Sequence, residues 1–198
     1  MGTLRVTLNA HLFLQQINHN GFNRVILERL PRLNLPQAHL VAGCLFQTIW
    51  NVQAGLAPHH GIMDYDVFYF DEHDVSYEAE DHAIRRAAAL FADLPVRVEL
   101  RNQARVHLWY EQRFGRPCPQ LSSTRAGIDR FLILATCVGI TSGPGGAHEV
   151  YAPHGFSDLV GGMLRPNPVH GDRALFEAKA RSYQERWPWL HLCGVKAG

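Results

Sequence analysis

Three acidic residues on two predicted strands are the part of the sequence best suited to chemistry. Asp64 and Asp66 lie in the stretch 64–70, whose aromatic and β-branched residues are typical of a strand. Side chains alternate along a strand, so both carboxylates share one face, with Cα atoms about 7 Å apart. Glu99 lies in a second predicted strand, 96–100. Ionised carboxylates that are buried together repel each other, and a cation between them would remove that cost.

The chemistry that such acids support is phosphoryl transfer assisted by a divalent cation. Magnesium prefers oxygen ligands and usually binds one or two carboxylates together with phosphate oxygens. Two such ions can activate an attacking hydroxyl and neutralise the charge of in-line displacement at phosphorus. The alternative is that the acids lie on a solvated strand face or form ion pairs with Arg97 or Arg101. An Asp-x-Asp pattern without other signals would favour this alternative. The second acidic strand and a preceding glycine turn favour a site for magnesium or manganese instead.

The glycine turn precedes the first acidic strand. The apolar run 38–42 ends at Gly43, and residues 44–52 carry apolar side chains at helical spacing. Backbone N–H groups at such a turn, and at the start of the helix, can approach a phosphate closely. Gly43 and Cys44 are therefore predicted to bind nucleotide phosphates. Taken alone, Gly43 would better fit an ordinary connection between a strand and a helix.

Two arginines follow the second acidic strand. Arg101 and Arg105 are predicted to lie one helical turn apart, where their guanidinium groups can bind a triphosphate bidentately. Pairing with Glu99, Asp93 or Glu111 on a solvated surface is an equal alternative. Both arginines are therefore candidate nucleotide-binding residues.

The predicted elements place the two acidic strands side by side. Ser76 is a suitable N-cap, carboxylates follow it in the first turn, and an apolar stripe continues over the helix 77–93. This helix connects the strands 64–70 and 96–100. A strand–helix–strand unit makes its strands parallel through a right-handed crossover, and here it would make them neighbours.

The whole chain is predicted to form one α/β (α+β-like) domain, residues 1–198, in which helices flank a mixed sheet. An N-terminal pair of helices occupies 1–35, and the catalytic core occupies 36–115. Residues 116–198 supply a C-terminal hairpin and further helices. This organisation keeps all candidate site residues within the middle segment.

Turn signals divide the C-terminal segment. The glycine-rich stretch 143–146 predicts a turn between strands at 136–140 and 149–152. A final helix beginning at Asp172 places four apolar residues on one face: Phe176, Ala180, Tyr183 and Trp187. That face is expected to pack against the rest of the domain.

Composition restricts the possible partners. The net charge of +1 over 198 residues argues against extended nucleic-acid binding by a basic surface. The longest apolar run, 131–140, is too short to span a bilayer, and the N-terminus lacks a signal-peptide pattern. Four dispersed cysteines without a CxxC pair are typical of reduced thiols, so a cytoplasmic protein with no membrane partner is expected. For His59 and His60, a surface or core role is predicted rather than metal binding.

Five segments resemble the polymerase-β-type nucleotidyltransferase superfamily and, more closely, a family of small bacterial nucleotidyltransferase family proteins. The similar segments are 40–51, 64–69, 99–110, 152–159 and 165–168. The resemblance implies an NTP and magnesium as substrate and cofactor, with Asp64, Asp66 and Glu99 as metal ligands. It also implies that Glu99 helps to activate the attacking hydroxyl, but it specifies no acceptor.

We therefore expect a metal-dependent nucleotidyltransferase that moves a nucleoside monophosphate from an NTP to an unknown hydroxyl acceptor. The alternative is a catalytically inactive nucleotide- or partner-binding module with the same fold. Cys44 supports this alternative, because it stands where the superfamily usually has Ser or Gly and is a poorer hydrogen-bonding group. A metal-dependent hydrolase that uses the same acids is a third possibility.

Overall fold

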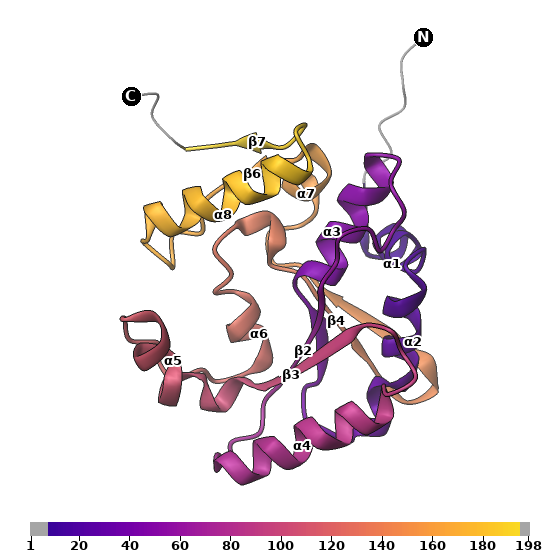
Figure 1. Cartoon of the computed structure of the whole chain (residues 1–198), viewed down its shortest axis with the longest axis vertical. Helices are drawn as coiled ribbons and strands as arrows, with labels where there is room; N and C mark the ends of the chain where they lie inside the picture. Colours follow the sequence, from indigo (N-terminus) through magenta and orange to yellow (C-terminus); the bar gives the residue numbers. More distant parts are fainter. Residues whose placement is uncertain (1–7, 195–198) are drawn as a thin grey trace.

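The computed structural model describes residues 8–194 (Figure 1). The α-helices are α1 (Ala10–Ile17), α2 (Gly21–Arg29), α3 (Gly43–Gln53), α4 (Tyr77–Leu90), α5 (Val106–Phe114), α6 (Thr124–Ile128), α7 (Ser157–Gly161) and α8 (Arg173–Arg186). The strands are β1 (His39–Val41), β2 (Asp64–Tyr69), β3 (Arg97–Asn102), β4 (Gly139–Ser142), β5 (His148–Tyr151), β6 (Met163–Leu164) and β7 (His191–Leu192). The 3-10 helices are η1 (Leu30–Leu33), η2 (Gln103–Arg105), η3 (Leu134–Thr136) and η4 (Pro144–Gly146).

A mixed five-stranded sheet occupies the centre, in the order β3–β2–β1–β4–β5. β2 and β3 run parallel, and the other neighbours run antiparallel. The register pairs Asp66 of β2 with Glu99 of β3 on one side and with Val41 of β1 on the other. The predicted mixed sheet flanked by helices is confirmed, and the short run before Gly43 is a strand.

The strand–helix–strand unit that carries the acids forms as the pattern predicts. The Ser76 side chain caps α4 by accepting a hydrogen bond from the Ala79 amide at 3.2 Å. Ala83, Ala87 and Phe91 are buried on the stripe that faces the core. Because α4 returns the chain to the same side, β3 becomes the parallel neighbour of β2.

Two details differ from the sequence prediction. Arg101 and Arg105 are predicted to share one helix, but β3 continues to Asn102 and η2 precedes α5. The strand predicted at 136–140 begins at Gly139, and η3 occupies the residues before it. In a buried apolar run the hydrophobic pattern has no periodicity, so it does not indicate where η3 ends and β4 begins. The predicted N-terminal helical pair is α1 and α2, and residues 1–7 of its range lie outside the described part of the chain.

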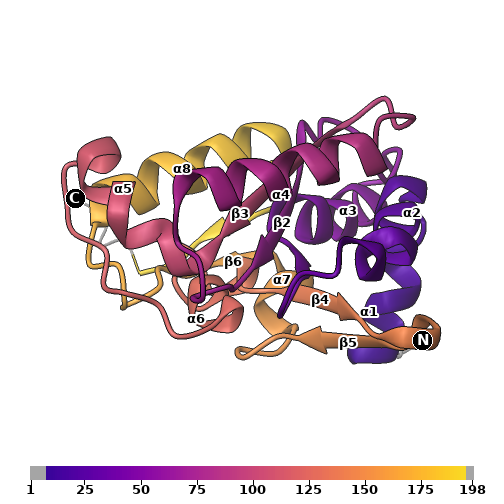
Figure 2. The ribbon, with the colours of Figure 1, turned by 90° about the horizontal axis from the view of Figure 1, so that it is seen from below.

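Aromatic packing fixes α8 against α3. The Trp50 ring centroid lies 5.4 Å from that of Tyr183 and 5.3 Å from that of Trp187. Trp187 Nε1 donates a hydrogen bond to Asn51 Oδ1 at 3.0 Å within this buried contact. Figures 1 and 2 show α8 at one end of the molecule with α5 and α6, and α1 and α2 at the other end. The C-terminal helix is therefore held against α3.

Among the helices of residues 8–194, none combines the length and apolar character that crossing a bilayer requires.

Candidate active site

The three predicted acids lie on one face of β2 and β3. Parallel pairing sets Asp66 beside Glu99 and Asp64 beside Arg97. The Arg97 guanidinium lies 2.8 Å from Glu99 Oε1 and 3.8 Å from Asp64 Oδ1, which joins the two strands across this face. Arg101 approaches Glu99 Oε2 at 3.5 Å from further along β3. The structure thus brings together the acidic trio and one of the two predicted arginines.

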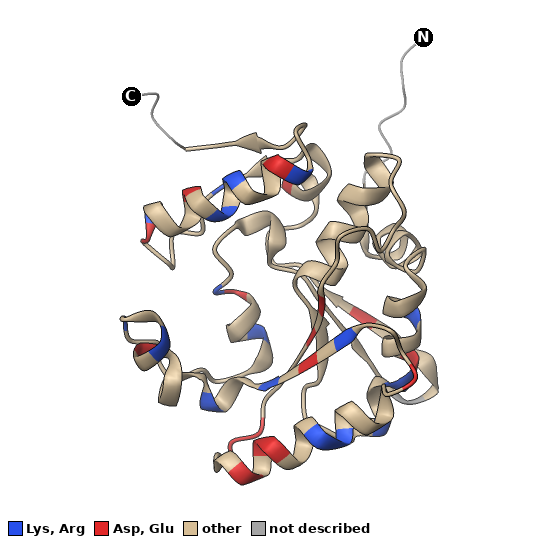
Figure 3. Cartoon of the chain, in the orientation of Figure 1, with Lys and Arg blue, Asp and Glu red and all other residues tan. Residues whose placement is uncertain are grey.

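Asp66 carries the least compensated charge of the trio. Burial, and then the negative charges of Glu99 and Asp64, raise the pKa of Asp66 from its usual 3.8 to about 6. The positive charges of Arg101 and Lys179 oppose this shift without cancelling it. Figure 3 shows acidic segments on β2 and β3, a basic segment on β3, and segments of both charges on α5 and α8. A further cation at Asp66 would relieve the repulsion that the three carboxylates exert on one another.

The carboxylates of the acidic trio are suitable ligands for a divalent cation, but their arrangement in the structure does not form a complete metal site. Within residues 8–194, no three His, Cys, Asp or Glu side chains are arranged to hold a metal ion. The Glu99 carboxylate is 21% exposed and engaged by Arg97, whereas Asp64 is 41% exposed. Carboxylate oxygens of Asp64 and Asp66 are hard donors of the kind that magnesium prefers. These two residues therefore fit a metal, and Glu99 can join them only when Arg97 releases it.

The β1–α3 turn lies directly beside the acids. Val41 pairs with Asp66, so the two residues after Val41 begin at the level of that carboxylate. Ala42 has φ +61° and ψ −137°, a backbone conformation that residues with a Cβ rarely adopt. Gly43 opens α3, and a Cβ there would lie 2.5 Å from Gln47 Nε2. This tight turn therefore places the start of α3 beside Asp66, and the first amides of a helix are groups that an anion can approach.

Cys44 does not present its side chain to this face. It is fully buried, and its Sγ donates a hydrogen bond to the Val41 carbonyl oxygen at 3.2 Å. Burial raises the pKa of the Cys44 thiol well above its usual range, so the group stays neutral. Only the Cys44 backbone can contribute to a phosphate site. The presence of Cys instead of Ser or Gly at this position is therefore weaker support for an inactive module.

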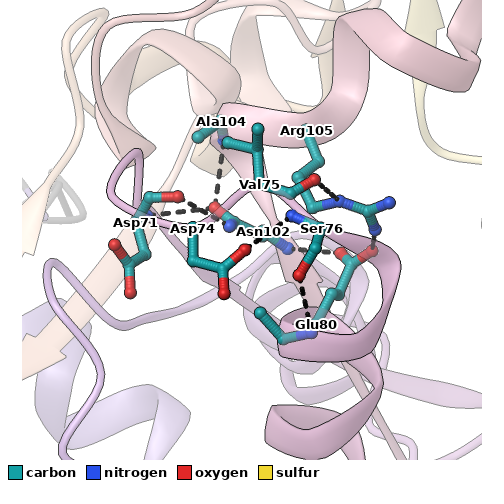
Figure 4. Close-up of polar contacts among 9 residues, drawn as sticks. Asp71, Asp74, Val75, Ser76, Glu80, Asn102, Ala104 and Arg105 are labelled. Carbon is teal, nitrogen blue, oxygen red and sulfur yellow. Dashed lines mark hydrogen bonds and ion pairs between the residues drawn. The ribbon is translucent and has the colours of Figure 1, made fainter.

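Arg105 lies in a different network, away from the acids. Its guanidinium forms a buried ion pair with Glu80, and its Nε donates to the Val75 carbonyl oxygen at 2.8 Å (Figure 4). Glu80 also accepts a hydrogen bond from the Asn102 amide at 2.8 Å. This network ties the loop before α4 to the end of β3. The proposed role of Arg105 in nucleotide binding therefore has no geometric support, because the side chain is turned into the protein.

A cavity of about 900 Å³ lies beside the acids and the turn. Its lining includes four predicted site residues: Gly43, Asp64, Asp66 and Arg101. Three others are not part of the lining: Cys44, Glu99 and Arg105. Aromatic residues of α3, α5, α8 and the α6–η3 connection supply much of the remaining wall: Phe46, Trp109, Tyr110, Phe114, Phe131 and Tyr183. The volume is in the range of small-molecule sites.

Sequence reasoning missed four cations of the cavity wall: Arg116, Arg130 and, on α8, Lys179 and Arg186. Lys179 and Arg186 flank the apolar stripe of α8, so the sequence pattern indicates that both side chains point away from the core. No local pattern shows that this stripe packs on α3, and only that contact brings the cations to the site. His59 and His60 are exposed in the loop before β2, outside the cavity lining.

The fold places the chain among α/β proteins in which helices flank a mixed sheet, and comparisons with known proteins specify the family. A family model described as nucleotidyltransferase matches residues 28–192, so the chain belongs to that nucleotidyltransferase family. The resemblance noted in the sequence is confirmed. This family and the fold support an enzyme that performs nucleotidyl transfer.

One solved structure shares the fold over nearly the full length of both chains. It is an NMR structure described as revealing a CCA-adding enzyme head domain, and it matches with a TM-score of 0.73 and 23% identity. The match covers 94% of this chain and 97% of the other. At this identity the similarity shows the fold alone. No curated protein matches this chain.

Proposed function

We propose that this protein transfers a nucleoside monophosphate from an NTP to a hydroxyl acceptor, with Mg²⁺ or Mn²⁺ as cofactor. The observation that carries the proposal is the position of Asp66. Its carboxylate is under-compensated, borders the cavity, and lies next to the turn that opens α3. A metal-bound polyphosphate would satisfy the acids and the turn amides at the same time.

The residues would divide the reaction between them. Asp64 and Asp66 would hold the cation, which supplies charge neutralisation at the phosphates when it is bound. The turn at Gly43 would receive phosphate oxygens, and Arg101 would add a positive charge from the cavity wall. The acceptor oxygen forms a bond to the α-phosphorus, and the bond from that phosphorus to the leaving pyrophosphate breaks. Glu99, released from Arg97, would take the hydroxyl proton.

The acceptor remains the open part of this proposal. The similar head domain is described as part of a CCA-adding enzyme, but identity of 23% supports only the shared fold. The acceptor is therefore best found by assay. An RNA end, a protein hydroxyl, a sugar and other small hydroxyl compounds are the classes to test.

The direct test uses NTPs labelled at the α-phosphate, a divalent cation and fractionated cell extract. Wild-type protein should transfer label to one fraction and release pyrophosphate, and Asp66→Asn should abolish both. Asp81→Asn is the matched control, because Asp81 lies on α4, outside the cavity lining, and forms an ion pair with the exposed Arg85. Label transfer that survives in Asp66→Asn would remove the acids from the mechanism.

The second candidate is a nucleotide-binding module without turnover. The engagement of Glu99 by Arg97 at 2.8 Å favours it, because that ion pair withholds the third carboxylate. Such a module would be stabilised by an NTP with a divalent cation, by about 2.7 kcal/mol at a hundredfold excess over the dissociation constant. It would show that stabilisation and yet transfer no label to any fraction. Absence of any stabilisation by any NTP would argue against both candidates.

A further inference from the structure

Two cations on α8 border the same cavity as the acids and the α3 turn. Lys179 and Arg186 both contribute to the cavity lining. Their helix is fixed in place by the packing of Tyr183 on Phe46, with ring centroids 5.5 Å apart, and by the contact of Trp187 with Trp50. The two positive charges are thus held at the cavity by a rigid element rather than by a loop.

Neither cation is neutralised by a carboxylate. Among residues 8–194, Lys179 and Arg186 form no ion pair. Lys179 Nζ lies 5.2 Å from the Tyr183 ring centroid, and the Arg186 guanidinium lies 4.3 Å from the Trp187 ring centroid. Asp66 is near enough for its charge to act on Lys179. Two uncompensated cations beside an under-compensated carboxylate leave room for a ligand that carries both a metal and negative charge.

Arg186 also connects α8 to the phosphate-facing turn. Its two terminal nitrogens donate to Gln47 Oε1 and to the Gly61 carbonyl oxygen, each at 3.0 Å. Gln47 Nε2 occupies the space where a Cβ of Gly43 would lie. The α8 cations, the first turn of α3 and the loop before β2 therefore meet at one end of the cavity.

We propose that Lys179 and Arg186 form a polyphosphate-binding wall, in which Lys179 contacts the terminal phosphates of the NTP and Arg186 holds the turn that receives them. This inference rests on the proposed function and specifies which part of the substrate faces α8. When the bond to the α-phosphorus breaks, negative charge develops on the departing pyrophosphate. A cation held there by packing stabilises that charge without reorganising.

The test measures the binding of inorganic tripolyphosphate, and separately of a non-hydrolysable NTP with Mg²⁺, by isothermal titration calorimetry. Lys179→Met keeps the length of the side chain and removes its charge. It should weaken tripolyphosphate binding about tenfold or more, the usual loss for one charge-assisted hydrogen bond. Lys179→Arg should recover most of the affinity. Arg181→Met is the control and should bind like wild type, because Arg181 is exposed on the same helix but outside the cavity lining.

The outcomes separate this inference from the proposed function. If wild type binds both ligands and Lys179→Met binds them equally well, the α8 wall is not a phosphate site, while nucleotidyl transfer stands. If Lys179→Met and Arg181→Met weaken binding equally, the effect is general surface charge, and the inference also fails. If wild type binds neither tripolyphosphate nor the NTP, the proposed function itself is wrong, and the inference fails with it.

Discussion

Asp66→Asn should make the protein more stable at neutral pH while it removes activity. The pKa of Asp66 is raised from 3.8 to about 6 by burial and by two neighbouring carboxylates, which corresponds to about 3 kcal/mol. The folded state therefore holds the Asp66 proton more tightly than the unfolded state does. Stability from this group is fully present below about pH 4 and is lost as the pH rises through about 6. An amide of the same shape carries no such charge.

The assay is urea unfolding of wild type and Asp66→Asn at about pH 5 and about pH 8. The advantage of the Asn variant should be larger at the higher pH, by about 1.4 kcal/mol. Comparing the two pH values cancels any constant effect of the amide on packing. Asp81→Asn should show no such gain between the two pH values. An Asp66→Asn advantage that is identical at both would refute the claim that Asp66 is an under-compensated carboxylate.

Metal binding supplies the complementary result. Magnesium with an NTP should stabilise the wild type at about pH 8, because it neutralises the repulsion that the variant has already lost. The same addition should stabilise Asp66→Asn much less, and removal of the metal by a chelator should reverse the wild-type gain. Repulsion between carboxylates lowers stability, and catalytic sites commonly give up stability for function in this way.

Three further predictions concern the supports of the site. Arg105→Met should lower the free energy of unfolding by about 3–5 kcal/mol, because it leaves the buried Glu80 unpaired. The NTP affinity of the folded protein should be unchanged, and a loss of affinity without a loss of stability would contradict this structural role. Ala42→Gly should raise the free energy of unfolding by about 1 kcal/mol in a urea titration, because glycine adopts the positive φ of this turn without strain. A loss of stability would show that the turn is unstrained. Cys44 should resist thiol reagents until the protein unfolds, whereas Cys118 should react in the native protein, with Cys44→Ala as the reference for the titration.

The local features of the site were predictable from the sequence because they depend on neighbouring residues. The period of two in β2 places Asp64 and Asp66 on one face, and the Ser76 cap marks the start of α4. The connection through α4 then makes Glu99 a neighbour of Asp66. These inferences need only strand geometry, helix capping and the preferred handedness of crossovers.

The position of Arg105 differs from its predicted position because its side chain could turn to either of two environments. The sequence predicts Arg105 one helical turn after Arg101, but Arg101 is still in β3 and Arg105 belongs to η2. That short 3-10 turn directs Arg105 to Glu80 and the protein interior. No spacing rule distinguishes a buried ion pair from a phosphate ligand.

The contribution of α8 could not be predicted at all from local patterns. The stripe that contains Tyr183 and Trp187 shows that one face of α8 is buried, but not which surface covers it. The packing of Trp50 of α3 on these two rings supplies that information. Contacts between segments so far apart in the chain bring Lys179 and Arg186 to the cavity. These two members of the candidate phosphate site therefore appear only in the structure.

The most direct test of the central claim is the position of Mn²⁺ in crystals grown with a non-hydrolysable NTP, located by its anomalous scattering. The metal should lie within coordination distance, about 2.0–2.2 Å, of carboxylate oxygens of both Asp64 and Asp66. The triphosphate should contact the turn at Gly43, and Arg97 should have moved away from Glu99. A nucleotide bound elsewhere, or a metal that touches neither aspartate, would contradict the account.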